Sequence, residues 1–211
     1  MKPVSRVLGV LILALGGLLA TVPAQAGDVL SRLDRFLAEV GSGQGSFSQI
    51  VVSRSGRRPQ RSVGEFAFAR PGRFLWVYTE PYPQRLVSDG ARLWSYDQDL
   101  NQVTVKPLGD ALGATPAAIL AGEGDLARNF AVSDNGRRDG LDWVVARPKA
   151  PDSPFTDMEL GFDGAELRAM LIRDSFGQQT ELRFDRFERN PSIDPALFRF
   201  VPPAGADVIG E

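Results

Sequence analysis

Short segments that alternate apolar and polar residues, separated by turn-forming pairs, follow one another along most of this chain. Residues 73–79 are the clearest case. Phe74, Trp76 and Tyr78 would share one face of a strand there, because successive side chains of a strand point to opposite sides. Asp89-Gly90 is typical of a tight hairpin turn. The pattern predicts a mainly β domain of about ten or eleven antiparallel strands.

Two segments break this rhythm and predict helices. Apolar residues recur at helical spacing from Asp28 to Val40. A shorter helix is expected from Thr115 to Gly122, with Pro116 at its first position. Such helices could cover one face of a curved sheet that is apolar on both sides. No repeat or linker interrupts residues 27–211, which we interpret as a single domain.

The first 26 residues have the composition of a secretory signal peptide. Lys2 and Arg6 precede an apolar run from Val7 to Leu19, and Ala24-Gln25-Ala26 offers small residues to a signal peptidase. We expect cleavage after Ala26 and a periplasmic product. Because the chain has 0 Cys, that product has no cysteine for a lipid anchor.

The composition excludes several kinds of catalytic and metal site. The chain has 0 His and 0 Cys, so Ser-His-Asp triads, thiolate nucleophiles and zinc sites built on these residues are absent. No phosphate-binding loop occurs. A net charge of -2 gives no support to nucleic-acid binding. We therefore expect no enzyme, no metal and no cofactor. A hydrolase based on paired carboxylates stays as an alternative, although no pattern selects a pair.

One arginine stands beside many aromatic residues. Alternation places Phe66, Phe68 and Arg70 on one face of a predicted strand. If Phe74 and Trp76 of the next strand share that face, a permanent cation lies at the mouth of an apolar hollow. The free carbonyls at a helix C-terminus would be suitable acceptors for it. The alternative is that Arg70 ends its strand in water and that the aromatic residues form an ordinary core.

An ordered set of motifs runs through residues 27–211. The motifs are Arg70-Pro71-Gly72-Arg73-Phe74-Leu75-Trp76, Gln84-Arg85-Leu86-Val87-Ser88-Asp89-Gly90, Leu93-Trp94-Ser95-Tyr96-Asp97, Gly113-Ala114-Thr115-Pro116, Pro148-Lys149, and the final Leu197-Phe198, Phe200, Pro202-Pro203 and Gly205. In this order the motifs resemble those of the LolA-type periplasmic lipoprotein carriers, and the resemblance covers essentially all of residues 27–211.

This resemblance implies an unclosed antiparallel β-barrel of about eleven strands, with short helices forming a lid over an apolar cavity. It implies that Arg70 hydrogen-bonds the lid backbone and latches the empty form closed. Ile119 and Leu120 would belong to the lid helix. The predicted acyl-chain cavity is lined by five aromatic residues: Phe66, Phe68, Phe74, Trp76 and Trp94.

The function implied by the resemblance is that of a monomeric carrier. It would take acylated lipoproteins from an inner-membrane ABC-type release complex and pass them to an outer-membrane receptor. The alternative is a lipid- or lipoprotein-sensing module on the same unclosed barrel. The role of the Arg-rich segment 54–61 stays open.

Overall fold

The computed structural model describes residues 27–54, 56, 58–111, 116–122 and 126–210. The predicted signal peptide and the predicted cap Thr115 lie outside these residues. No helix among the described residues is long and apolar enough to cross a membrane.

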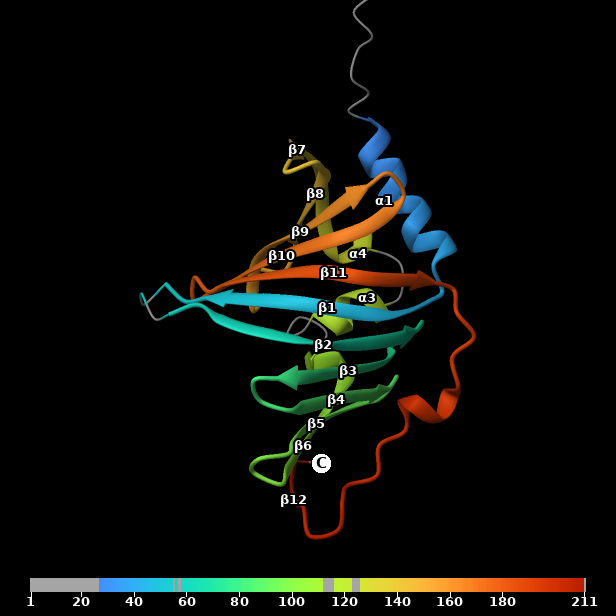
Figure 1. The fold of residues 1–211 in the computed structure, drawn as a ribbon. Coiled ribbons are helices and arrows are strands. Elements are labelled where there is room, and N and C mark those ends of the chain that lie inside the picture. Colours follow the sequence, from blue (N-terminus) through green and yellow to red (C-terminus); the bar gives the residue numbers. More distant parts are fainter. Residues whose placement is uncertain (1–26, 55, 57, 112–115, 123–125, 211) are drawn as a thin grey trace, which may run out of the picture.

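A single sheet of twelve strands makes up most of the described chain (Figure 1). The strands are β1 (Ser42–Val52), β2 (Gln60–Ala69), β3 (Arg73–Glu80), β4 (Gln84–Asp89), β5 (Arg92–Asp97), β6 (Gln102–Pro107), β7 (Phe130–Arg138), β8 (Leu141–Pro148), β9 (Phe155–Asp163), β10 (Glu166–Asp174), β11 (Gln179–Arg189) and β12 (Asp207–Gly210). Their spatial order is β12-β6-β5-β4-β3-β2-β1-β11-β10-β9-β8-β7. Because β12 and β7 are separate edges, the barrel is not closed.

Helices cover one face of this sheet, here called the inner face. They are α1 (Gly27–Glu39), α2 (Leu108–Ala111), α3 (Pro116–Ala121) and α4 (Leu126–Asn129). In Figure 1, α3 and α4 lie behind the sheet, and α1 runs along its upper right side. Buried residues of α1 and α3 belong to the same core cluster as those of the central strands. The core therefore lies between the sheet and these two helices.

The C-terminal segment covers part of the other face, here called the outer face. It leaves β11, forms the short 3-10 helix η1 (Pro195–Phe198) against β3 and β4, and ends in β12 (Figure 1). Phe198 is buried there, and Arg73 stacks over its ring. The segment thus shields the outer side of the strands whose inner side contributes to the core.

The predicted fold class is confirmed, with two differences in detail. β12 pairs in parallel with β6, whereas the sequence predicts antiparallel strands only. Its four residues are too few to show alternation. The structure also has twelve strands where about ten or eleven are predicted, and β1 begins at Ser42, so that Gly43 and Gly45 lie inside it. A side chain at Gly43 would meet the ring of Phe68, so these glycines let β1 lie close to its neighbours.

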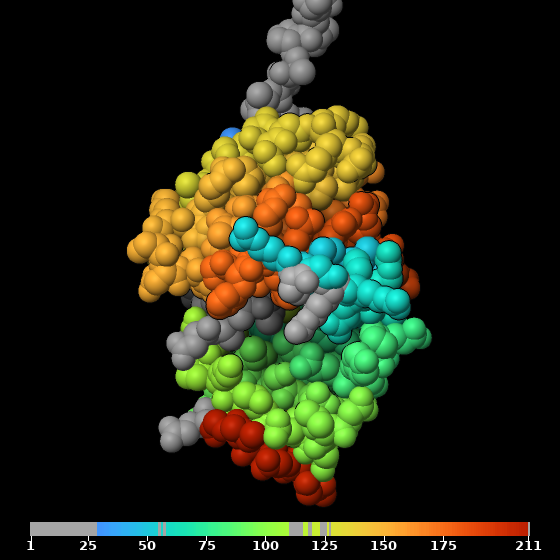
Figure 2. All heavy atoms as spheres, turned by 90° about the vertical axis from the view of Figure 1, so that its left-hand side faces the viewer, coloured from blue at the N-terminus to red at the C-terminus, as the bar shows by residue number. Residues whose placement is uncertain are grey.

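Two hairpin turns meet at the end of the sheet that faces the viewer in Figure 2. The turn after β1 carries the exposed Arg54, and its side chain lies against Gly177 in the turn after β10. β1 and β3 both run toward this end (Figure 1). Arg70 lies at the opposite end, next to the start of β1.

The close packing of β2 yields a prediction at Gly64. A Cβ atom there would lie 1.9 Å from the carbonyl oxygen of Val77 and 2.8 Å from the ring of Phe47. We expect Gly64→Ala to lower the free energy of unfolding by about 1–3 kcal/mol. Gly41→Ala is the matched control, because nothing lies within 4 Å of a Cβ at Gly41. Urea unfolding of both variants measures the difference, and equal stabilities would contradict this account of the packing.

Candidate functional site

An aromatic surface occupies the inner face of three central strands. It is defined here as the aromatic face, and consists of Phe47, Phe66, Phe68, Phe74 and Trp76. All five are buried, with at most 4% of their surface exposed. The register pairs Phe66 with Trp76 and Phe68 with Phe74, so period two brings them onto one face. The ring centroids of Phe47 and Trp76 are 4.3 Å apart in a stacked arrangement.

A β-bulge adds two rings to this surface that alternation alone would separate. Phe184 and Phe187 are three residues apart in β11, so regular alternation would put them on opposite faces. The register with β1 shifts between Ser46 and Phe47, so that Asp185 is the extra residue of β11 with no opposite residue in β1. As a result, Phe184 and Phe187 both lie 5.3 Å from Phe66 between ring centroids. The sequence does not reveal such a bulge.

Two helices add apolar side chains to the core on the inner face: α3 packs against β2 and β3, and α1 packs against β7 and β8. The buried residues of α1 and its end are Val29, Leu33, Phe36 and Val40, and those of α3 are Ala117, Leu120 and Ala121. Phe36 packs edge-on against Phe187 and Phe162. The structure is therefore a closed form, in which the protein's own side chains cover the aromatic face.

Arg70 joins both covering helices to the sheet. Its Nε donates a hydrogen bond to the carbonyl oxygen of Leu120 in α3 at 2.9 Å. Its Nη1 donates to the carbonyl oxygen of Leu37 in the last turn of α1 at 2.8 Å. The last carbonyls of a helix have no partner within the helix and carry the negative end of its dipole. One cation thus satisfies acceptors of two helices at once, and the alternative that Arg70 ends its strand in water is wrong.

The surroundings of Arg70 reinforce this position. Its guanidinium lies 5.6 Å from the ring centroid of Phe36 and 5.8 Å from that of Phe68. Burial lowers the pKa of Arg70, but an arginine keeps its charge at neutral pH. In the turn that follows, the amide of Gly72 donates to the carbonyl oxygen of Ala121 at 2.7 Å. The turn between β2 and β3 therefore holds the C-terminal end of α3 by two hydrogen bonds.

One residue predicted for the cavity lining lies on the wrong face. Trp94 pairs with Val87 across the strands, and Val87 pairs with Leu75, whereas Trp76 pairs with Leu86. Trp94 therefore lies on the outer face, where its ring stacks on Phe200 of the C-terminal segment. The correction follows from register, which two-residue alternation in an isolated strand cannot fix.

The other predicted residues are in place on the inner face or in the predicted helix. Phe66, Phe68, Phe74 and Trp76 are part of the aromatic face, and Leu120 is buried in α3. Ile119 lies within α3, and its side chain is outside the described residues. The sequence places Phe36 on the apolar face of the first helix, but neither Phe36 nor Phe47 is predicted as part of the site. Period-two spacing was the available signal for Phe47.

Comparison with known proteins identifies relatives over nearly the whole chain. Residues 38–201 match the family described as outer membrane lipoprotein carrier protein LolA. The outer-membrane lipoprotein carrier protein of Dechloromonas aromatica (strain RCB) is 47% identical over 211 residues, which cover 100% of this chain and 99% of that protein. That of Methylobacillus flagellatus is 45% identical over 184 residues, which cover 87% of this chain and 90% of the relative.

Among solved structures, a conserved protein from Thermus thermophilus has a similar fold. The TM-score is 0.52 at 16% identity, and the match covers 87% of this chain and 98% of that one. At this identity the similarity concerns the fold alone.

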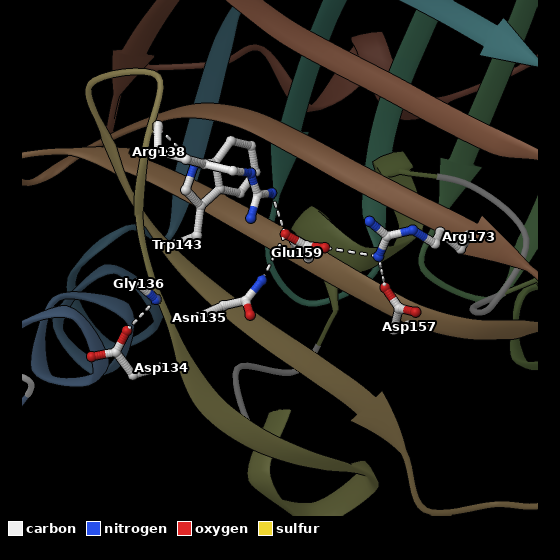
Figure 3. Close-up of polar contacts among 8 residues, drawn as sticks. All are labelled: Asp134, Asn135, Gly136, Arg138, Trp143, Asp157, Glu159 and Arg173. Carbon is white, nitrogen blue, oxygen red and sulfur yellow. Dashed lines mark hydrogen bonds and ion pairs between the residues drawn. The ribbon is translucent and has the colours of Figure 1, made fainter.

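A polar network lies on the outer face, away from the aromatic face (Figure 3). Glu159 of β9 is 3% exposed and accepts hydrogen bonds from Arg138, Arg173 and Asn135. Arg173 also pairs with Asp157, and Arg138 lies 4.1 Å above the ring centroid of Trp143. The network thereby connects β7, β8, β9 and β10.

The ion pairs of this network link four strands, and its carboxylates are not arranged for glycosidase chemistry. Burial alone would raise the pKa of Glu159, but the hydrogen bonds and positive charges of Arg138 and Arg173 together lower it. A glycosidase-like pair needs one carboxyl group that stays protonated near neutral pH. Glu159 and Asp157 share a cation instead, so they do not form such a pair. Among the described residues, no cluster of three or more carboxylates could hold a metal ion.

The network predicts a pH-dependent contribution to stability. Because the pKa of Glu159 is lowered in the folded state, the contribution is present above its ordinary pKa of about 4.3 and is lost as the pH falls through the folded-state pKa. We expect Glu159→Gln to lower the free energy of unfolding by about 1–3 kcal/mol at pH 7. The difference from the unmodified protein should shrink below about pH 4.

Glu181→Gln provides the control for this measurement. Glu181 and its partner Arg183 are 35% and 54% exposed, so loss of this pair should cost less than about 1 kcal/mol. Denaturant unfolding at several pH values measures both variants. A penalty for Glu159→Gln that is the same at pH 7 and pH 3.5 would refute the ionised state of this carboxylate.

Proposed function

The chain belongs to the family of outer membrane lipoprotein carrier proteins called LolA, and we propose that it carries acylated lipoproteins across the periplasm. The single observation that supports this most is the aromatic face, which is covered by two helices that Arg70 holds in place. A carrier needs a large apolar surface that can be covered when it is empty. We infer that residues 27–211 form the mature single domain after cleavage behind Ala26.

The physics of the cargo requires such a surface. A triacylated cysteine exposes about 45 methylene groups, which at about 0.8 kcal/mol each amounts to roughly 35 kcal/mol of unfavourable hydration. The aromatic face offers rings from three strands, and α1 and α3 add apolar side chains to the same core. In our proposal, acyl chains enter between the helices and the sheet and replace contacts that the closed form makes with itself.

Arg70 supplies a cover that can be opened. Its two hydrogen bonds to helix carbonyls each contribute about 1.5–3 kcal/mol, which is small against the burial of acyl chains. Cargo therefore shifts the equilibrium toward an open form, and the hydrogen bonds favour closure once the cargo has left. Ile119 and Leu120 would move with the lid helix in this scheme.

The direction of transport comes from partners. We propose that an inner-membrane ABC-type release complex loads the carrier and that an outer-membrane receptor accepts the cargo. The protein itself would act as a chaperone and not as an enzyme, because binding and release of acyl chains break no covalent bond.

A release assay tests the proposed function. Purified residues 27–211 are incubated with spheroplasts of a bacterium that supplies the matching inner-membrane proteins. We expect outer-membrane lipoproteins to appear in the soluble fraction in complex with this protein. If a known carrier releases them under the same conditions and this protein does not, the carrier role is refuted in favour of a lipid-sensing module.

The latch proposal predicts a specific defect in Arg70→Leu. This variant should fold and accept cargo, because it loses no apolar surface. It should transfer cargo to acceptor membranes at least tenfold more slowly, because the closed form is no longer favoured after release; a tenfold change corresponds to about 1.4 kcal/mol. Transfer is followed by the amount of lipoprotein that sediments with outer membranes.

Arg92→Leu is the matched control, because Arg92 is an exposed arginine of β5, whereas α3 packs against β2 and β3 and α1 against β7 and β8. It should transfer cargo at the normal rate. Normal transfer by Arg70→Leu would remove Arg70 from the proposed mechanism.

A further inference from the structure

A small group of uncharged polar residues interrupts the apolar inner face. It is defined here as the polar cluster, and consists of Gln49 of β1, Ser62 of β2, Tyr78 of β3 and the indole nitrogen of Trp76. Gln49 is paired with Ser62 in the register, and both are buried, with 8% and 9% of their surface exposed. The hydroxyl of Tyr78 donates to Oε1 of Gln49 at 3.3 Å. Three adjacent strands thus bring polar groups together beside the aromatic face.

Trp76 carries a hydrogen-bond donor without an acceptor. Its side chain is 2% exposed, and Nε1 has no hydrogen-bond partner among the described residues. Burial raises the pKa of the Tyr78 phenol, and the nearby indole of Trp76 offsets part of this rise. The indole N–H and the Tyr78 hydroxyl nevertheless do not form a hydrogen bond. A buried donor without a partner costs about 1–3 kcal/mol, and native structures rarely leave one.

The position of the polar cluster is informative as well. Gln49 lies six residues along β1 from Gly43, which contacts the ring of Phe68 next to Arg70. At about 3.3 Å per residue, Gln49 is roughly 20 Å from Gly43, whereas Trp76, which pairs with Phe66, lies nearer to that end of the sheet. Gln49 and Tyr78 lie near the ends of β1 and β3, away from the start of β1 beside Arg70. The inner face is therefore mainly aromatic toward Arg70 and carries the uncharged polar cluster further along its length.

We propose that the polar cluster binds the carbonyl groups of the lipid-modified cysteine, with Trp76 Nε1 donating to an ester or amide oxygen. This inference rests on the proposed carrier function and assigns an orientation to the cargo. The acyl chains would extend from the cluster along the aromatic face toward Arg70.

The polar cluster is uncharged, which favours neutral ester or amide carbonyl groups as its ligands. Its members are neutral, and burial raises the pKa of Tyr78, so the phenol stays protonated at neutral pH. A phosphate or a free carboxylate would call for Arg or Lys, which the cluster lacks. Ester and amide oxygens are neutral acceptors that lie at the head of the acyl chains, and a neutral donor suits them.

The three tryptophans of the chain permit a direct spectroscopic test. The probe is a synthetic triacylated cysteinyl peptide, and its comparison is the analogue in which ether links replace the glyceryl esters. Indole N–H resonances are recorded in ¹⁵N-labelled protein. We expect the Trp76 signal to move downfield with the ester probe and less with the ether probe.

Trp143 and Trp94 are internal controls. The indole of Trp143 donates to the carbonyl oxygen of Arg138 at 3.1 Å on the outer face, and Trp94 stacks on Phe200 on the same face. Their signals should not distinguish the two probes. A Trp76 signal that responds equally to ester and ether probes would overturn the proposal.

Affinity measurements provide a second test. The unmodified protein should bind the ester probe about five- to tenfold more tightly than the ether probe, as expected for one hydrogen bond. This ratio should fall to about one in Trp76→Phe and in Gln49→Leu, and should persist in Trp143→Phe. If Trp76→Phe and Gln49→Leu both still bind the ester probe about five- to tenfold more tightly than the ether probe, the polar cluster does not bind the ester groups. If neither probe binds the unmodified protein, both the proposed carrier function and the role of the polar cluster are refuted.

Discussion

The apolar inner face of an open sheet has to be covered, and in this protein one half-buried arginine joins the two covering helices to the sheet. Arg70 donates to Leu37 in α1 and to Leu120 in α3, so a single side chain satisfies carbonyls that neither helix can satisfy itself. These bonds join two helices to one turn of the sheet, and we propose that they break when cargo enters and re-form when it leaves. An apolar core sealed by packing alone would not open so easily.

The two faces of the sheet differ in composition and in what covers them. The inner face gathers aromatic rings beneath α1 and α3, whereas the outer face is closed by the C-terminal segment over β3 to β5 and by the Glu159 network over β7 to β10. Structural ion pairs are thus kept away from the surface that we propose for acyl chains. The inner face is itself graded, with the Arg70 latch at one end and the polar cluster toward the other. This gradient matches a ligand with long apolar chains and a polar head.

Much of the inner face could be predicted from sequence, because strand alternation is a local property. Phe66, Phe68, Phe74 and Trp76 follow period two and occupy one face as expected. Arg70 donates to carbonyl oxygens near helix C-termini, which are the acceptors that the sequence suggested for it. What failed depends on register between strands. Alternation within β5 alone does not show which face Trp94 occupies. Its pairing with Val87, which pairs with Leu75, places Trp94 on the outer face. Phe187 reaches the inner face only through a bulge, and β12 is too short to give a pattern.

Hydrogen exchange at the Gly72 amide tests the opening of the cover most directly. This amide donates to Ala121 of α3 and is therefore protected only while α3 lies on the sheet. On binding a triacylated cysteinyl peptide, its exchange should become at least tenfold faster, while amides between β1 and β11 stay protected. Unchanged protection of Gly72 in the fully loaded protein would contradict an opening of the Arg70-held cover.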